Sequence, residues 1–498
     1  MTPTLHPPHP VARPGRWIAL SALALAVLLV TVDATVLGLA TPYISAELRP
    51  SGTQLLWIGD VYSFVLAGLL VSMGGLGDRI GRKRLLLVGA TAFGLVSVLN
   101  AFAPTAELMI VARALLGIAG ATLMPATLAL IRNLFEDPRE RSLAIGIWGA
   151  AGSGGMAVGP VLGGVLLEHF WWGSVFLINV PVMAVLVLVG IVTLPESRDP
   201  NPGPWDLVSV GLSMSGMLGV VYAIKEITAH GPSWGALAAA VIGAAGLAGF
   251  VHRQLVLERP LLNMRLFADR AFSGAVLADL MAILGLAGLT YFLSQFFQLV
   301  QGRGPLEAGL AELPAVLGAV VGGLVAGRAA RAMSVRVVVA GGLAAVGLSL
   351  AVLTAVSRDT GYPFLGSLLL IVGFGAGMAF TVTADVILST VHPDQAGAAS
   401  AVSEMAHELG AALGIAVLGS IVTGVYRAFP ASPGTPGSAR ESLGGAVDAA
   451  QRLTPESAGA LLDAARAAFV DGLSLAAGAG AVILLAAAVA SWFFLDER

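Results

Sequence analysis

The sequence contains no cysteine and has few charged residues. Without cysteine, disulfide bonds, thiol catalysis and cysteine-ligated metals are all excluded. Charged residues make up only 11% of the 498 residues, whereas a soluble domain usually has about a quarter. A chain of this size with so few charges cannot cover its surface with polar groups, which indicates that much of the surface faces lipid.

Other scarcities exclude further classes of protein. The net charge is −3 and no long basic run occurs, so nothing favours nucleic acid as a partner. The chain has seven histidines, most of them near termini and loops, and no cluster of them indicates a metal site. No Gly-x-x-x-x-Gly-Lys-Ser/Thr string occurs, so we do not expect ATP hydrolysis at a P-loop. The sequence thus predicts neither a cofactor nor a metal.

Long apolar runs are what the sequence has in abundance. A membrane-spanning helix needs about 20 apolar residues to cross roughly 30 Å of hydrocarbon. On this basis we predict spans near 17–41, 54–74, 85–103, 106–131, 142–167, 173–194, 206–229, 235–256, 272–299, 306–330, 335–356, 363–390, 398–426 and 470–494. The first run is too long for a signal-peptide core and has no obvious cleavage site. The predicted fold class is an all-α polytopic membrane protein with about fourteen transmembrane helices.

The spacing of these runs predicts the organisation of the chain. A tail at 1–16 precedes a six-helix half at 17–194, a Pro-rich linker follows at 195–204, and 205–256 holds two inserted helices. The second six-helix half covers 257–498 and includes an outer loop at about 427–469. We interpret this loop as a surface appendage without chemistry, helical in its Ala-rich second part.

The distribution of basic residues predicts the orientation. If the N-terminus is cytoplasmic, inner loops and tails hold 18 of the 27 Lys and Arg residues. The short outer loops hold four, namely Arg49, Lys225, Arg303 and Arg358. Because basic residues concentrate in short cytoplasmic loops, both termini are predicted to be cytoplasmic. Nearly all the basic residues are Arg, which suggests a GC-rich bacterial genome and hence the bacterial plasma (inner) membrane.

The loop between the second and third predicted spans combines glycines, one acid and a basic cluster. From its charges alone, the loop could equally well be a functional motif or a basic cluster that only keeps the loop in the cytoplasm. The order of its residues resembles the signature loop of the major facilitator superfamily, with matches at Gly74, Asp78, Arg79, Gly81, Arg82 and Lys83. The resemblance implies the major facilitator fold, in which the aspartate belongs to a cytoplasmic latch between the two halves.

A second motif lies in the fifth predicted span and consists of Gly155, Gly159, Pro160, Gly163 and Gly164. Glycines four apart line one helix face and allow close packing, and a proline kinks the helix. A generic small-residue interface would explain the glycines alone. The full string resembles the antiporter motif of the drug-exporting branch of the superfamily.

Further stretches narrow the resemblance to one branch. Residues 32–37, 57–63, 176–181 and 308–314 resemble the fourteen-helix drug:proton antiporters, especially exporters of quaternary ammonium compounds and other cationic drugs. Ala319 stands where some of these exporters carry an acidic residue. The resemblance implies a transporter and not an enzyme, and we expect it to be a monomer. It would export small lipophilic, cationic drugs across the bilayer in exchange for protons. The expected mechanism is alternating access.

Ionisable residues inside spans cost roughly 2.5–3.5 kcal/mol or more, so each is a functional candidate. At 1.5 Å per residue, Asp33 lies about 24 Å from the inner end of its helix, and Asp60 and Arg113 lie roughly 9 and 12 Å below the outer end. The three therefore share one layer, and we predict that Arg113 pairs with Asp33 or Asp60. The region around Arg113 also resembles the third motif of the family, whose arginine is associated with proton coupling.

Glu404 and Glu408 are four apart in the thirteenth predicted span and therefore share a helix face. A carboxyl group in an apolar cavity exchanges protons nearer neutrality than one in water. Two stacked carboxylates could also attract a cation. A static role in joining helices is the alternative for both, and it explains Asp279, Glu312 and Asp385 equally well.

Aromatic side chains near such a site could stack on a cationic drug. The candidates are Trp57, Trp148, Tyr291 and Phe296, although anchoring at the lipid interface explains each nearly as well. Two alternative functions stay open at this point. The chain could export a host metabolite such as an antibiotic or a siderophore, because the same pocket chemistry serves both. A membrane-embedded enzyme or a receptor is disfavoured, since neither a catalytic cluster nor a soluble signalling domain is evident.

Overall fold

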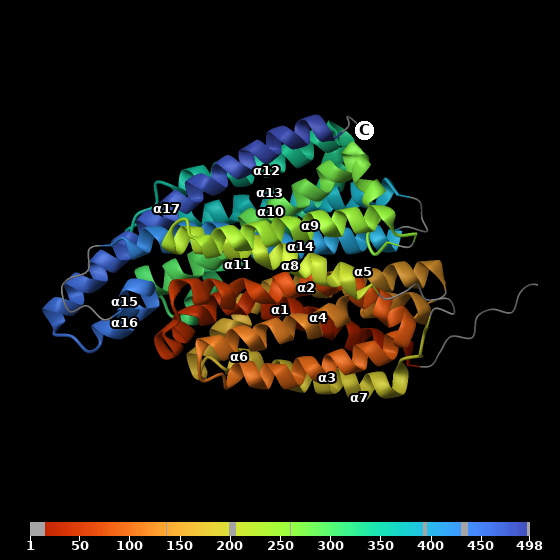
Figure 1. Cartoon of the computed structure of the whole chain (residues 1–498), viewed down its shortest axis with the longest axis horizontal. Coiled ribbons are helices and arrows are strands. Elements are labelled where there is room, and N and C mark those ends of the chain that lie inside the picture. Colours follow the sequence, from red (N-terminus) through yellow and green to blue (C-terminus); the bar gives the residue numbers. More distant parts are fainter. Residues whose placement is uncertain are drawn as a thin grey trace, which may run out of the picture.

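The computed structural model describes residues 15–135, 137–198, 206–258, 260–391, 396–429 and 437–495. Most of the predicted tail at 1–16 and of the linker at 195–204 therefore lies outside the described residues. The described part of the chain is almost entirely helical, and the long helices run side by side as one elongated bundle (Figure 1).

The first group of helices consists of α1 (Arg16–Leu48), α2 (Gly52–Ile80), α3 (Arg82–Ala101), α4 (Ala106–Leu134), α5 (Pro138–His169), α6 (Ser174–Leu177) and α7 (Asn179–Thr193). The inserted pair is α8 (Leu207–His230) and α9 (Trp234–Val256). The remaining helices are η1 (Met264–Ala268), α10 (Arg270–Gln295), η2 (Phe296–Val300), α11 (Pro305–Met333), α12 (Val335–Leu353), α13 (Tyr362–Ser389), α14 (Ala396–Arg427), α15 (Gly437–Glu441), α16 (Leu443–Ala450) and α17 (Pro455–Phe494).

Thirteen helices among the described residues are long and apolar enough to cross a membrane, or fourteen when the bent α5 is counted as one span. In α5 the segments Ile147–Met156 and Val158–His169 meet at 46°. Pro160 lies just beyond this break, and a proline inside a helix removes a backbone hydrogen bond and favours a kink. The predicted fold class is confirmed. Each predicted span overlaps one of these helices, but α17 begins at Pro455, well before the span predicted at 470–494.

The long helices form two groups that meet along two seams. Helices α1–α7 pack mainly on one another, as do α10–α14 with α17, and the groups touch where α2 packs on α14 and α5 on α11 (Figure 1). The inserted helix α8 packs on α9 and also contacts both α2 and α14. It therefore lies beside one of the seams where the two halves meet.

Glycines of α5 allow close packing both on α1 inside the first half and on α11 at the second seam. A Cβ atom on Gly155 would lie 2.5 Å from the carbonyl oxygen of Leu28 in α1, and one on Gly159 would lie 1.9 Å from Oγ1 of Thr35. On the other side of α5, a Cβ atom on Gly164 would lie 2.7 Å from Cα of Leu306 in α11. The close packing predicted for the glycine motif is thus confirmed, and it involves both neighbours of α5.

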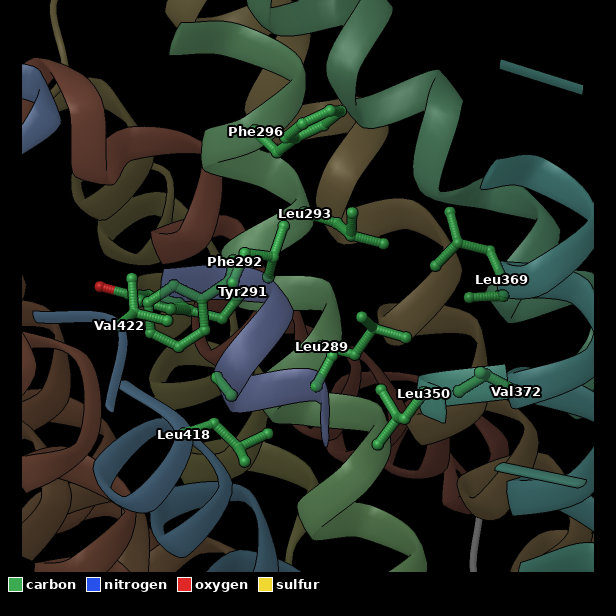
Figure 2. Packing of buried hydrophobic residues seen from close by; sticks show 14 of the residues in the cluster. Leu289, Tyr291, Phe292, Leu293, Phe296, Leu350, Leu369, Val372, Leu418 and Val422 are labelled. Atoms are coloured by element: carbon green, nitrogen blue, oxygen red, sulfur yellow. The ribbon is translucent and has the colours of Figure 1, made fainter. Parts of the chain in front are cut away.

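Apolar side chains fill the second half. Phe292 and Phe296 of α10 and η2 lie among leucines and valines of α12, α13 and α14, including Leu350, Leu369 and Leu418 (Figure 2). These side chains are almost fully buried. This core holds α10 and α14 together, and both helices carry carboxyl groups.

The segment predicted as a surface appendage is instead packed onto the bundle. Helices α15 and α16 lie at the end of the bundle opposite the C-terminus (Figure 1). Leu443 and Ala446 of α16 are buried, and the hydroxyl groups of Ser442 and Ser45 in α1 are 2.7 Å apart. Glu441 accepts hydrogen bonds from the backbone N–H of Gly52 and from Arg427. This segment therefore links α1 and α2 of the first half to α14 of the second.

Candidate functional site

A buried ion pair joins α4 to α1. Nη1 of Arg113 donates to Oδ2 of Asp33 at 3.0 Å, and Nε donates to the carbonyl oxygen of Ile58 at 3.2 Å. The guanidinium also lies over the ring of Tyr62, 4.8 Å from its centroid. Both charged side chains are fully enclosed, with exposed fractions of 1% and 0%. The ion pair predicted from helix depth is confirmed.

Asp33 has a second donor that the sequence analysis did not single out. Nδ2 of Asn179 in α7 donates to Oδ1 of Asp33 at 2.8 Å, and it also lies 3.1 Å from Oγ of Ser97 in α3. The network therefore draws on α1, α3, α4 and α7. Asn179 lies in one of the stretches that carry the family resemblance, and its polarity within an apolar span was the available signal. The carboxylate of Asp33 is held by donors on both oxygens.

Asp60 has a different partner from the one considered, and this corrects the assignment of Lys225 to an outer loop. Lys225 lies in α8 with 2% of its surface exposed. Its Nζ donates to Oδ1 of Asp60 at 2.8 Å and lies 2.8 Å from Oδ2. A basic residue near the end of an apolar run resembles a loop residue in the sequence. Contact between α8 and α2 instead places this ammonium inside the bundle, opposite a carboxylate.

Trp57 completes this second site. The ammonium of Lys225 lies 3.9 Å from the centroid of the Trp57 ring, one helical turn from Asp60. Trp57 also packs beside a small apolar cluster centred on Phe64, Val221, Ala412 and Ala416, from α2, α8 and α14. Of the four aromatic candidates, Trp57 is the one whose ring contacts a cation in the described residues.

Glu404 and Glu408 lie on the face of α14 near α2 and α10. Both side chains are partly exposed, and Ser63 of α2 is within hydrogen-bonding reach of Glu408. The adjacent Ser403 donates to Oδ2 of Asp279 in α10 at 3.1 Å, and Asp279 and Glu404 are close enough to repel one another. Three acids therefore gather where α14 meets α2 and α10. In the described part of the chain, no basic side chain lies within ion-pair distance of them.

The remaining carboxyl candidates lie apart from this group. Glu312 is buried in α11, within reach of the Ser294 hydroxyl of α10. Asp385 is exposed near the end of α13. Near the glutamates, the ring of His407 packs edge-on against Phe380, with 5.3 Å between the ring centroids.

The other three aromatic candidates contact neighbouring helices: two form hydrogen bonds with threonines, and one is buried in the apolar core. Nε1 of Trp148 donates to Oγ1 of Thr127 at 3.2 Å. The hydroxyl of Tyr291 accepts from Oγ1 of Thr41 at 3.2 Å, which joins α10 to α1. Phe296 is fully buried in the core (Figure 2).

The signature loop adopts the tight turn that its glycines predict. Gly81 has φ +111°, and a Cβ atom there would lie 2.4 Å from Oε1 of Glu196. Glu196 accepts from the backbone N–H of Lys83, whose Nζ donates to the carbonyl oxygen of Ile191 at 2.7 Å. The backbone N–H of Arg82 donates to the carbonyl oxygen of Ser197. The loop is thus bound to the last turn of α7 and to the segment that follows it.

Other motif residues flank this turn. Gly74 faces Pro125 of α4, where an added Cβ atom would make ordinary contact, and Arg79 is exposed in the last turn of α2. The side chain of Asp78 lies outside the described residues, so its part in a latch stays a prediction.

The molecule is a bundle of membrane-spanning helices with one ion pair buried inside the first half and a second between α2 and the inserted helix α8. Such a bundle, divided into two halves that meet along seams, has the construction of a solute transporter. The chain belongs to the Major Facilitator Superfamily, whose family model matches residues 23–415. It is therefore a multi-pass membrane transporter and not an enzyme.

Two relatives extend the likeness over nearly the whole chain. The chain is 46% identical to the multidrug efflux pump LfrA of Mycolicibacterium smegmatis over 95% of both chains. It is 39% identical to the methyl viologen resistance protein SmvA of Salmonella typhimurium, over 97% of this chain and 99% of that one. In structure it resembles a bacterial homologue of the human lysosomal transporter Spinster in an inward-facing conformation, with a TM-score of 0.63, 17% identity and 97% coverage of each chain.

Proposed function

We propose that the protein exports small lipophilic cations from the bacterial cytoplasm in exchange for protons, as a monomer with both termini cytoplasmic. The names of its relatives support export of drugs, and one of them is named for resistance to methyl viologen, a dication. The resemblance to drug:proton antiporters supports the proton as the coupling ion.

The acid group formed by Asp279, Glu404 and Glu408 is the observation that carries the proposal. Its carboxylates come from α10 and α14 of the second half, while Ser63 comes from α2 of the first. A site between the two halves is where alternating access exposes a solute to each side in turn. Carboxyl groups without a basic partner in the described residues can be neutralised by a proton or by a cationic substrate. The two would then compete for one site, which is the requirement for exchange.

The Asp33–Arg113 pair is the second element of the proposal. Both groups lie within the first half and have protein partners, so neither needs the substrate to balance its charge. A proton arriving at Asp33 would neutralise the carboxylate and release Arg113. We assign Asp33 and Arg113 to proton coupling within the first half, and Glu404 and Glu408 to recognition of cations in competition with protons.

Transport by proteoliposomes tests the proposal. The protein should accumulate radiolabelled methyl viologen when a proton gradient is imposed, and an uncoupler should abolish this uptake. The double variant Glu404→Gln/Glu408→Gln should lose transport of the dication methyl viologen most and that of the monocation tetraphenylphosphonium less. A neutral lipophilic substrate should be least affected, because it gains nothing from a carboxylate.

The matched control is Glu456→Gln, which removes an acid from the exposed start of α17, remote from the acid group. It should transport all three compounds as the parent does. Equal losses for all three classes in the double variant would assign the glutamates to proton coupling or folding instead. Uptake that ignores both the gradient and the uncoupler would refute the exchange mechanism.

A further inference from the structure

The pair formed by Lys225 and Asp60 has features that simple packing does not require. Replacing a buried ion pair by apolar side chains of similar volume is often neutral or stabilising, so such a pair is weak support for a purely structural role. The two groups are almost completely enclosed, with side-chain exposures of 1% and 0%. The lysine comes from α8, one of the two inserted helices, and the aspartate from α2.

The surroundings of the ammonium are those of a binding site for a cation. Nζ lies 2.8 Å from a carboxylate oxygen of Asp60 and 3.9 Å from the centroid of the Trp57 ring. A carboxylate together with an aromatic face is the chemistry by which proteins recognise ammonium ligands. The chain therefore holds its own ammonium where a substrate's cationic centre would be bound in the same way.

The location of this pair also suits substrate binding. Trp57 is partly exposed and packs against the apolar cluster of α2, α8 and α14, and so does Leu409, the residue after Glu408. Ser63, one turn along α2 from Asp60, is within reach of Glu408. The Trp57–Asp60 site and the acid group are thus neighbours along one helix of the seam between the two halves.

The choice of lysine is informative, since Lys83 and Lys225 are the only two lysines in a chain with 27 Lys and Arg residues. Arginine would hold a carboxylate through two parallel hydrogen bonds and could stack flat on the indole. Lysine presents a compact point charge on a flexible stem, which can leave the site by changing rotamer. A cation that must be exchanged is better provided by lysine.

We propose that Trp57 and Asp60 form a cation-binding subsite that Lys225 occupies as a tethered competitor, so that a lipophilic substrate cation binds there by displacing the Lys225 ammonium. This inference rests on the proposed function, because it assumes a cationic substrate. It goes further by assigning a specificity role to an inserted helix. The occupied state keeps Asp60 neutralised when no substrate is present.

Binding of tetraphenylphosphonium to the purified protein in nanodiscs, measured by calorimetry, tests the assignment. The variant Lys225→Met keeps an unbranched side chain of similar length without the charge. It should bind tetraphenylphosphonium about tenfold more tightly than the parent, because the substrate no longer has to displace a cation from a carboxylate and an aromatic face. The gain should disappear in Lys225→Met/Asp60→Asn. Binding of the neutral triphenylphosphine oxide should change in neither variant.

Two further variants provide a control and a second test. Arg253→Met removes the other cation of the inserted helix pair, which bonds to Asp206 at the far end of α8, and it should leave tetraphenylphosphonium affinity unchanged. Trp57→Leu should weaken tetraphenylphosphonium binding several-fold while sparing the neutral analogue, and this holds even if Lys225→Met fails to fold.

The possible outcomes are distinguishable. Unchanged or weaker tetraphenylphosphonium binding by folded Lys225→Met, or parental binding by Trp57→Leu, would overturn the assignment. A parent protein that binds no tetraphenylphosphonium at all would refute the proposed function itself.

Discussion

Replacing Asp33 by Asn removes one charge from a fully enclosed ion pair while it keeps the volume of the side chain. Arg113 would then retain its hydrogen bond to the carbonyl oxygen of Ile58 and its contact with Tyr62, but no carboxylate at 3.0 Å. Breaking a buried pair by removing one partner typically costs about 3–5 kcal/mol. Since Asn179 also loses a charged acceptor, we expect a loss of stability in the upper part of this range and no proton-coupled export.

The assay must separate coupling from stability. Proteoliposomes containing a pH-sensitive dye report proton movement when drug is added, and thermal unfolding in detergent reports stability. Asp33→Asn should show no drug-induced proton movement. The double variant Asp33→Asn/Arg113→Met also removes the stranded cation, so it should recover much of the lost stability without recovering proton movement.

Two results would refute this reasoning. Drug-induced proton movement in Asp33→Asn at the parental rate would show that Asp33 is not a coupling residue. Recovery of proton movement in the double variant would show that Asp33 serves only to balance the charge of Arg113. The role assigned to the pair would then have to be given up.

Three further predictions concern packing and the signature loop. Thr35→Ala should rescue the thermal stability lost in Gly159→Ala but not that lost in Gly155→Ala, because the first clash is with a side-chain hydroxyl and the second with the backbone carbonyl of Leu28; equal rescue of both would contradict the packing. Gly81→Ala should lower the melting temperature, since Gly81 has φ +111° and faces Glu196, whereas the control Gly75→Ala, with no atom within 4 Å of the added methyl group, should not. The hydrogen bonds from Arg253 lower the pKa of Asp206 to about 2, so this carboxylate contributes stability above its unfolded value of about 4 and loses it as the pH falls through 2. Asp206→Asn should therefore be less stable than the parent by about 1–2 kcal/mol at pH 5 but not at pH 2, as measured by thermal unfolding.

Much of the fold could be predicted because the bilayer imposes a simple rule on the sequence. Each span needs an apolar run of sufficient length, and such runs are visible without any knowledge of tertiary contacts. Depth along each helix was also sufficient to predict that Arg113 pairs with Asp33 or Asp60, since a buried arginine needs a carboxylate at its own level, but it could not choose between the two. The same rule gave no sign that α16 is buried against the bundle, because Leu443–Ala450 is too short to be a span, and its burial depends on the neighbouring α1.

Lys225 shows why the rest of the site could not be predicted. Its position near the end of an apolar run fits the pattern of a loop residue, and counting basic residues assigned it to the outside. Its burial follows from the packing of α8 against α2, which depends on side chains far apart in the sequence. Asn179 was missed for a similar reason. An amide in a span acquires a role only when a carboxylate from another helix lies opposite it.

The balance of charge differs between the two halves, and this leads to a last prediction. In the first half, Asp33 and Asp60 each have a basic partner within 3.0 Å. In the second half, Asp279, Glu404 and Glu408 have no such partner among the described residues, and we propose that protons neutralise some of them when no substrate is bound. A cation that binds there should therefore release protons into solution. In weakly buffered medium, tetraphenylphosphonium should acidify a solution of the parent protein, and methyl viologen should release more protons per molecule bound than tetraphenylphosphonium does. Glu404→Gln/Glu408→Gln should lose most of this release, whereas Glu456→Gln should keep it. If cations bound to the parent without releasing protons, proton and substrate would occupy separate sites, and exchange would have to proceed through a conformational change and not through direct competition.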